Sequence, residues 1–379
     1  TGCLSQRFAD ELVESLPEVD LFVGSGSAKE VPDFVEELSP VDEGPNEPLV
    51  RVGKPGTLYD PDTPRTSTGV GYSTYIKIAE GCSQKCTFCI IPKLRGKARS
   101  RTVDDVVREV ENLVKNGVRE FNLIAQDLSH YGDDLKDGGQ TSLLALLRRL
   151  VRVQGVRWLR LMYCYPHAIG PELMELMASE PKLVPYVDIP LQHIDDEVLS
   201  KMQRRVGEYD TRALMESLRE NIPGIFLRTT FLVGFPGETA QQVKRLVDYA
   251  REFAFDHAGA FAFSVEEGTR SARLEGQVSD RVKRRRADRL GQVLQEAAHE
   301  RASNRLGEIY EAVVEEEGPL DGLFLGRHWG QAPEIDGQTM LHWSGEKLQP
   351  GTFVKIKLTH ATDFDLEAEV LEILELPAA

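Results

Sequence analysis

The chain has 379 residues, 41% of them apolar, which is enough to build two or three domains with a substantial core. No apolar run approaches the roughly 20 residues that a membrane span needs, and five cysteines, three of them clustered, do not form a disulfide framework, so we expect a cytoplasmic protein with no membrane partner. Charge is uneven, because residues 1–70 hold 5 basic and 14 acidic residues and 305–379 hold 5 and 15, whereas 71–304 hold 35 and 32.

The start of the chain predicts a partial α/β domain over residues 1–39. Two helical segments, RFADELVESL and SAKEVPDFVEEL, flank a short strand, VDLFV. An α/β layer normally needs more strands to bury its sheet, so we favour the end of a larger domain over a complete small cap. Thr1 is not an initiator methionine, and we expect a fragment or a processed product. Residues 40–71 contain six prolines and little periodicity, which predicts a linker.

Strand and helix patterns alternate from residue 72 to residue 304. Predicted strands lie near 73–79, 119–126, 157–163, 186–190, 225–233 and 257–264. The helical patterns that follow them cover 102–116, 141–153, 170–178, 209–220, 239–253 and 281–302. Six β-α units in series imply parallel strands with right-handed crossovers. A closed barrel would need eight units, so we predict an α/β fold with an open, partial (β/α)6 barrel whose active face lies at the carboxyl ends of its strands.

The helical period stops near residue 305. Short strand patterns follow, separated by Gly, Pro and Asp: YEAVVEE, GLFLGRH, TMLHW, FVKIKLTHA and AEVLEIL. They predict a small all-β barrel or sandwich over residues 305–379. The alternative, that these strands extend the main sheet, is disfavoured because the long helix at 281–302 separates the two patterns.

Three cysteines lie close together in EGCSQKCTFCIIP, residues 80–92, on the first loop that follows a predicted strand. Cys82, Cys86 and Cys89 form C-x3-C-x2-C, with no second pair to complete a four-ligand zinc site. A 4Fe-4S cluster held by three thiolates keeps one iron without a protein ligand, and that iron can bind a cofactor or substrate. Three unrelated buried thiols are the weaker alternative, because the residues lie in a Gly-containing loop and not on one apolar face.

The C-x3-C-x-F-C form of this motif resembles the signature of the radical S-adenosylmethionine enzymes, and the count of six units agrees with the partial barrel of that superfamily. The resemblance implies that the amino and carboxylate groups of S-adenosylmethionine bind the open iron. It implies also that an electron donor reduces the cluster and that an electron from the reduced cluster splits the sulfonium, giving methionine and a 5′-deoxyadenosyl radical that abstracts hydrogen. The protein's part in such chemistry is positioning and the exclusion of water.

Further blocks extend the resemblance to the methylthiotransferases over essentially the whole chain. They are TGCLSQRF, EGCSQKCTFCIIPKLRGKARSR, LIAQDLSHYG, YVDIPLQH, LRTTFLVGFPGET and AFAFSVEEGT. On this resemblance, residues 1–39 are the C-terminal part of the methylthiotransferase N-terminal domain, 72–304 the radical SAM core, and 305–379 a TRAM-like β domain.

Two branches of the methylthiotransferases compete. One modifies an adenosine beside the tRNA anticodon, and the RimO-type branch adds a methylthio group to the β-carbon of an aspartate in a small-subunit ribosomal protein. LRTTFLVGFPGET and FSVEEGT resemble the RimO-type branch. The acidic C-terminal domain also suits a basic ribosomal protein better than a nucleic acid as the main substrate. A non-catalytic iron-sulfur or RNA-binding protein is the alternative from another class.

Cys3, in TGC, resembles the third cysteine of an N-terminal trio that holds a second 4Fe-4S cluster in the methylthiotransferases. The other two cysteines of the trio would lie upstream of Thr1. The fifth cysteine, Cys164 in LMYCYP, is expected to be a buried small hydrophobe.

The family resemblance further implies contacts with S-adenosylmethionine. Gln126 and Asp127 end the second predicted strand, where radical enzymes of this type hold the methionine amino group. Phe88 is expected to pack near the adenine, and Gln192 and Arg228, on the fourth and fifth strands, are further candidate contacts. Structural hydrogen bonding is the alternative for the polar residues, although polar side chains at barrel strand ends are frequently functional.

Overall fold

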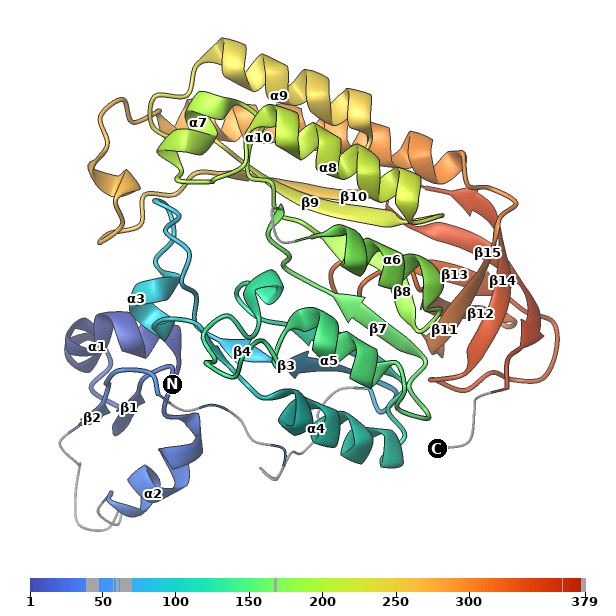
Figure 1. Cartoon of the computed structure of the whole chain (residues 1–379), viewed down its shortest axis with the longest axis horizontal. Helices are drawn as coiled ribbons and strands as arrows, with labels where there is room; N and C mark the ends of the chain where they lie inside the picture. Colours follow the sequence, from blue (N-terminus) through green and yellow to red (C-terminus); the bar gives the residue numbers. More distant parts are fainter. Residues whose placement is uncertain are drawn as a thin grey trace.

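The structure is a computed structural model that describes residues 1–38, 48–56, 58, 61, 70–166, 169–362 and 364–375. A small N-terminal segment lies at one end of a parallel sheet, and a β barrel lies at the other end (Figure 1). Within the described ranges, no helix combines the length and the apolar character that crossing a membrane would require.

The N-terminal segment pairs two short parallel strands. Its elements are α1 (Cys3–Ser15), β1 (Leu21–Val23), η1 (Ala28–Glu30), α2 (Val31–Glu36) and β2 (Leu49–Arg51). Leu21 lies opposite Leu49, and Val23 opposite Arg51. The prediction of a linker over 40–71 is therefore wrong for β2, which is too short to produce a recognisable period. Much of that stretch, 40–47 and 62–69 included, lies outside the described residues.

A six-stranded parallel sheet forms the middle of the molecule, in the order β10-β9-β8-β7-β6-β3. The strands are β3 (Ser73–Lys77), β6 (Glu120–Ile124), β7 (Trp158–Leu161), β8 (Leu183–Asp188), β9 (Phe226–Val233) and β10 (His257–Ala262). The outer strands β3 and β10 do not pair with each other, so the sheet is open, as the count of six units predicted.

The crossover helices cover one face of this sheet (Figure 1). They are α4 (Val103–Lys115), α5 (Leu143–Leu150), α6 (Pro171–Ser179), α8 (Glu208–Asn221) and α9 (Ala240–Phe253), and α10 (Asp280–Ser303), which follows the last strand, packs beside them. In α4 the Thr102 hydroxyl accepts a hydrogen bond from the backbone N–H of Asp105 and caps the helix, and its buried valines recur at helical spacing toward the sheet. The amphipathic pattern in the sequence thus fixes which side of each helix is buried.

Several shorter elements surround the carboxyl ends of the strands. They are the two-residue hairpin β4 (Ala79–Glu80) with β5 (Arg99–Ser100), helices α3 (Ile91–Arg95) and α7 (Asp196–Lys201), and the turns η3 (Leu128–His130) and η5 (Ser271–Arg273). None of them was predicted, because two to six residues carry too little periodicity.

The C-terminal strands form a separate closed barrel, in the order β11-β12-β13-β15-β14. They are β11 (Ile309–Glu317), β12 (Leu323–His328), β13 (Thr339–His342), β14 (Phe353–Ala361) and β15 (Leu366–Ile373). The alternative in which these strands extend the main sheet is therefore wrong. Trp158 and Phe226, the first residues of β7 and β9, pack edge to face on Phe353 and Tyr310 of the barrel, with ring centroids 4.9 and 6.0 Å apart. The barrel thus covers the amino ends of the parallel strands and leaves the carboxyl ends for a site.

Candidate functional site

The loop that carries the three cysteines, residues 80–92 (the cysteine loop), is held at its start by a turn that requires glycine. Gly81 has φ +79°, and a Cβ at this position would lie 2.3 Å from the carbonyl oxygen of Lys97. Glu80 forms ion pairs of 2.7 Å with Lys77 and 2.9 Å with Arg95. Burial alone would raise the pKa of Glu80, but these two cations lower it. The loop is therefore anchored before its first cysteine.

The three thiols of the cysteine loop lie near one another, and each is at least partly shielded from water. Cys82 is buried, and Cys86 and Cys89 are half-buried. The N–H of Cys89 donates to the carbonyl of Cys86 at 3.2 Å, which brings these two residues into one turn. Burial raises the pKa of Cys82 to about 11 and also raises the pKa of Cys89. The raised pKa values favour the protonated thiol at Cys82 and Cys89 until a metal such as iron replaces the proton.

The donor set fits a cluster better than a single ion. Among the described residues, no three His, Cys, Asp or Glu side chains are arranged to hold one metal ion. A 4Fe-4S cubane spreads its ligands over separate irons, so its thiolates lie farther apart than the ligands of one ion. Three cysteines on one loop match a cubane that has three thiolate ligands and one open iron.

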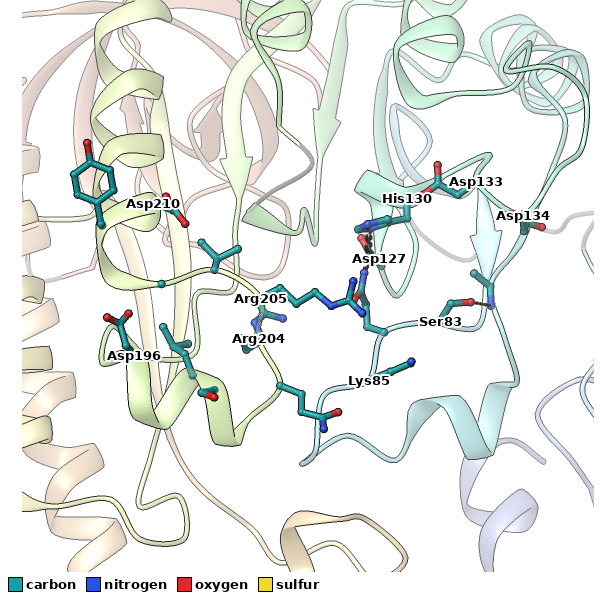
Figure 2. Close-up of a pocket in the computed structure, with 18 residues that line it drawn as sticks. Ser83, Lys85, Asp127, His130, Asp133, Asp134, Asp196, Arg204, Arg205 and Asp210 are labelled. Carbon is teal, nitrogen blue, oxygen red and sulfur yellow. Dashed lines mark hydrogen bonds and ion pairs between the residues drawn. The ribbon is translucent and has the colours of Figure 1, made fainter.

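A cavity of about 1130 Å³ opens beside the cysteine loop at the carboxyl ends of the strands. Most of its lining comes from three segments: residues 83–85 of the cysteine loop, residues from 127–134 after β6, and residues from 199–210, which span the end of α7, the connection to α8 and the first turn of α8. In Figure 2, Arg204 and Arg205 lie between the wall that carries Asp196 and Asp210 and the wall that carries Asp127 and His130. The volume is ample for a nucleoside-sized ligand beside a cluster.

Gln126 and Asp127 follow the carboxyl end of β6, as the sequence predicted, and Asp127 lines this cavity. The Asp127 carboxylate accepts hydrogen bonds from Gln84 at 2.8 Å and Ser129 at 2.9 Å, and lies 2.7 Å from His130 Nδ1. Burial alone would raise the pKa of Asp127, but these donors lower it. The Gln126 Oε1 atom is buried and has no hydrogen-bond partner among the described residues. Such an orphaned acceptor is costly to bury and is suited to a donor on a ligand.

The structure places Phe88 and Gln192 close to the same region. Phe88 packs against a small apolar cluster that includes Met202 and Phe263. Gln192 has φ +69°, and its backbone continues the sheet beside β9: its N–H donates to Thr230 at 2.8 Å and its carbonyl accepts from Leu232 at 2.7 Å. Non-glycine residues with positive φ occur frequently at functional sites.

Arg228 lies elsewhere. It is the third residue of β9, near the amino end, and its Nη1 bonds Asp336 of the C-terminal barrel at 2.8 Å while its Nε lies 3.7 Å from Asp188. Arg228 is not among the residues that line the cavity beside the cysteine loop, and its contact with the cofactor stays a prediction. The sequence identified the strand but not the end of the strand at which the side chain lies.

Cys164 and Cys3 differ in their surroundings. Cys164 is fully buried in the main core, as expected for a small hydrophobe, and burial raises its pKa. Cys3 is the first residue of α1 and is half-buried, and α1 packs on α3, the short helix that follows the cysteine loop. Burial alone would lower the pKa of Arg95 on α3, but its ion pair with Glu80 and, to a smaller extent, the nearby Cys3 raise it.

Sequence reasoning missed Arg204. Its guanidinium lies 3.9 Å from the centre of the Tyr165 ring, its Nη1 is 3.8 Å from the Cys86 sulfur, and its Nη2 donates to the Pro190 carbonyl. The dipeptide Arg204-Arg205 between two helices was the available signal, but nothing in it indicates a contact with a loop more than a hundred residues earlier.

Comparisons with known proteins agree with this architecture. Residues 76–250 match the family model of the radical SAM superfamily, and residues 306–371 match that of the TRAM domain. The ribosomal protein uS12 methylthiotransferase RimO of Syntrophotalea carbinolica is 44% identical over 375 residues, covering 98% of this chain and 80% of the relative. The protein of the same name from Desulforudis audaxviator is 45% identical over 374 residues, covering 99% and 81%.

Among solved structures, a radical enzyme provides an example of a similar fold. It is the radical S-adenosylmethionine methyltransferase TsrM from Kitasatospora setae with tryptophan and a SAM analogue bound, which is 22% identical, with a TM-score of 0.50 over 68% of this chain and 54% of that chain.

Proposed function

This chain belongs to the RimO family of ribosomal protein uS12 methylthiotransferases, and we propose that it adds a methylthio group to the β-carbon of an aspartate in that small-subunit ribosomal protein. One observation carries the proposal: three cysteines lie on a single loop at the carboxyl edge of an open parallel sheet, beside a cavity of about 1130 Å³. The steps would be hydrogen abstraction at the β-carbon, sulfur insertion, and methylation by a second S-adenosylmethionine.

Cys82, Cys86 and Cys89 would hold a 4Fe-4S cluster, and the cavity beside them would hold S-adenosylmethionine. When bound, the pair supplies a 5′-deoxyadenosyl radical once an electron donor has reduced the cluster. The chain's own part is to position and to exclude water. The orphaned Gln126 Oε1 would accept from the methionine amino group, and the Asp127 carboxylate would add negative charge beside it. Phe88 and the Gln192 backbone would line the adenosine end.

A second cluster would involve Cys3. Its position on α1, against the helix that follows the cysteine loop, supports a site near the first cluster, where sulfur could be delivered to a substrate radical. Two further cysteines from upstream residues would complete the set.

The acidic surface favours a basic protein over tRNA as the substrate. Residues 305–379 carry 15 acidic and 5 basic residues, and a TRAM-like barrel of that charge repels a phosphate backbone. Modification of tRNA adenosine is the second candidate, because TRAM domains are often RNA binders. Either substrate belongs to the translation machinery, which supports a cytoplasmic location.

Replacement of the cysteines tests the radical chemistry. We expect anaerobically reconstituted protein to cleave S-adenosylmethionine to 5′-deoxyadenosine, and Cys82→Ala, Cys86→Ala or Cys89→Ala to abolish cleavage and most iron binding, because each removes one of three ligands. Cys164→Ala is the matched control and should keep both, since that thiol is buried in the main core. Iron analysis and chromatography of the nucleoside product provide the measurements. Full cleavage by a triple variant of the loop cysteines would refute the proposal.

A further inference from the structure

Resting on the proposed function, we propose that Arg204 is a positioning residue that holds a fixed positive charge against the cluster ligand Cys86 and thereby raises the reduction potential of the cluster. Arg204 belongs to the connection between α7 and α8, whereas Cys86 belongs to the cysteine loop. The two meet across the wall of the large cavity, where Arg204 is among the lining residues (Figure 2).

Three contacts hold the guanidinium in place. Nη1 is 3.8 Å from the Cys86 sulfur, within the range of a hydrogen bond to sulfur, and Nη2 donates to the carbonyl of Pro190. The planar group also lies 3.9 Å from the centre of the Tyr165 ring, a close cation-π contact. Because the group is held on two edges and one face, its charge needs little rearrangement when a neighbouring group gains an electron.

The backbone around these contacts is also fixed. The N–H of Thr87 donates to the carbonyl of Met202 at 3.0 Å, and the Thr87 hydroxyl donates to the carbonyl of Lys201 at 2.9 Å. The residue after Cys86 is therefore bonded to the segment that leads into Arg204. The distance between the charge and the sulfur is set by the two backbones and not by a freely rotating side chain.

The direction of the effect follows from charge. Reduction adds one negative charge to the cluster and its thiolates, and a nearby cation or a hydrogen bond to a ligand sulfur stabilises that state. Cys86 is half-buried, so the interaction is screened less than one between two fully exposed groups. Direct binding of the S-adenosylmethionine carboxylate is the competing role, but both terminal nitrogens and one face of Arg204 already have partners.

A redox titration of the reconstituted protein without S-adenosylmethionine tests the proposal, with the reduced cluster followed by electron paramagnetic resonance. We expect Arg204→Gln to keep its iron and to shift the midpoint potential to more negative values. Arg204→Lys keeps the charge and should shift it less. Arg205→Gln is the matched control, because it removes the same charge one residue away, from an exposed side chain that also lines the cavity, and it should leave the potential unchanged.

Several results would overturn the proposal. They are an unshifted potential in Arg204→Gln, an equal shift in Arg205→Gln, or an equal shift in Arg204→Lys and Arg204→Gln. An unchanged potential with weaker S-adenosylmethionine binding would assign Arg204 to the ligand instead. If Arg204→Gln loses iron, the proposal is tested by comparing the midpoint potential of Arg204→Lys with that of the wild type. Failure of the proposed function is separate, since it would appear as wild-type protein that assembles no cluster on its loop cysteines.

Discussion

Some buried polar side chains have a hydrogen-bond partner for one polar atom and none for another. His193 follows Gln192 and is fully buried: its Nδ1 accepts from the N–H of Asp195 at 2.9 Å, while its Nε2 has no hydrogen-bond partner among the described residues. Burial lowers the pKa of His193 to about 4 from its ordinary 6.5. The side chain is therefore neutral in the folded protein at neutral pH, and His193 supports the turn after β8 without carrying charge.

The lowered pKa of His193 predicts acid sensitivity. Between about pH 6.5 and 4 the unfolded chain binds a proton at this position that the folded chain does not, so the free energy of unfolding falls as pH falls. The loss amounts to about 3 kcal/mol for a shift of this size. We expect His193→Gln to lose about 3 kcal/mol less than wild type over that range, measured by chemical denaturation at several pH values. Parallel curves for the two proteins would show that His193 is not the titrating group.

The sequence predicts site residues well when they are close to one another along the chain, and poorly when only folding brings them together. Cys82, Cys86 and Cys89 are close in sequence, and their spacing alone indicates a three-thiolate site. Arg204 and Cys86 are brought together only by folding of the connection after α7 onto the cysteine loop, and no local pattern records that contact. Arg228 lies on the fifth strand, as expected, but its hydrogen bond to Asp336 of the C-terminal barrel could not be predicted from the sequence.

At the scale of elements, the long periodic segments were predicted to within a few residues and the short ones were not. The predicted helix at 239–253 and α9 (Ala240–Phe253) agree because a capping box at Thr239 and a clear amphipathic pattern define it. The strand expected at 186–190 is instead β8 (Leu183–Asp188). Pro185 interrupts its pattern, and the pairing with β7 shifts register between Leu159 and Leu161, which accommodates the proline.

The turn at the start of the cysteine loop gives a prediction at this scale. Gly81→Ala would force a side chain into a left-handed backbone conformation and against the Lys97 carbonyl, so we expect a loss of roughly 2–4 kcal/mol in stability and most of the iron. Gly117→Ala is the control: φ there is +96°, but the nearest atom to its Cβ is 4.0 Å away, so only about 1 kcal/mol and no iron should be lost. Thermal melts and iron counts on both variants provide the comparison. Equal iron in the two would argue against a strict requirement for Gly81.

At the scale of the whole molecule, the C-terminal barrel and the parallel sheet share a core and a buried ionic network. Trp158, Tyr186 and Phe226 of the sheet belong to the same apolar cluster as the barrel interior. Glu120, which is fully buried, binds Arg160 at 3.1 Å and Arg327 of the barrel at 2.8 Å. Burial alone would raise the pKa of Glu120, but the two arginines lower it to about 2. The sequence predicted a separate β domain, but it could not predict the ion pair between Glu120 and Arg327, which lie 207 positions apart in the chain.

Loss of the ion pair between Glu120 and Arg327 should destabilise the protein strongly. Arg327→Met leaves the Glu120 carboxylate buried with one cation in place of two, and we expect a cost of about 3–5 kcal/mol. The control is Arg157→Met, which removes a more exposed ion pair with Glu311 between the same two parts and should cost at most about 1 kcal/mol. Urea denaturation followed by tryptophan fluorescence measures both. Similar midpoints for the two variants would contradict a structural role for the buried network.

The most direct test of the account is mass spectrometry of the products. Full-length protein, reconstituted anaerobically and supplied with S-adenosylmethionine, reductant and a sulfur source, would be incubated with ribosomal protein uS12 and, separately, with bulk tRNA. We predict one methylthio group on the β-carbon of a single uS12 aspartate and no change in tRNA adenosine. Methylthiolated adenosine with unmodified uS12 would contradict the proposed substrate, and cleavage of S-adenosylmethionine without methylthio product on either would contradict the proposed reaction.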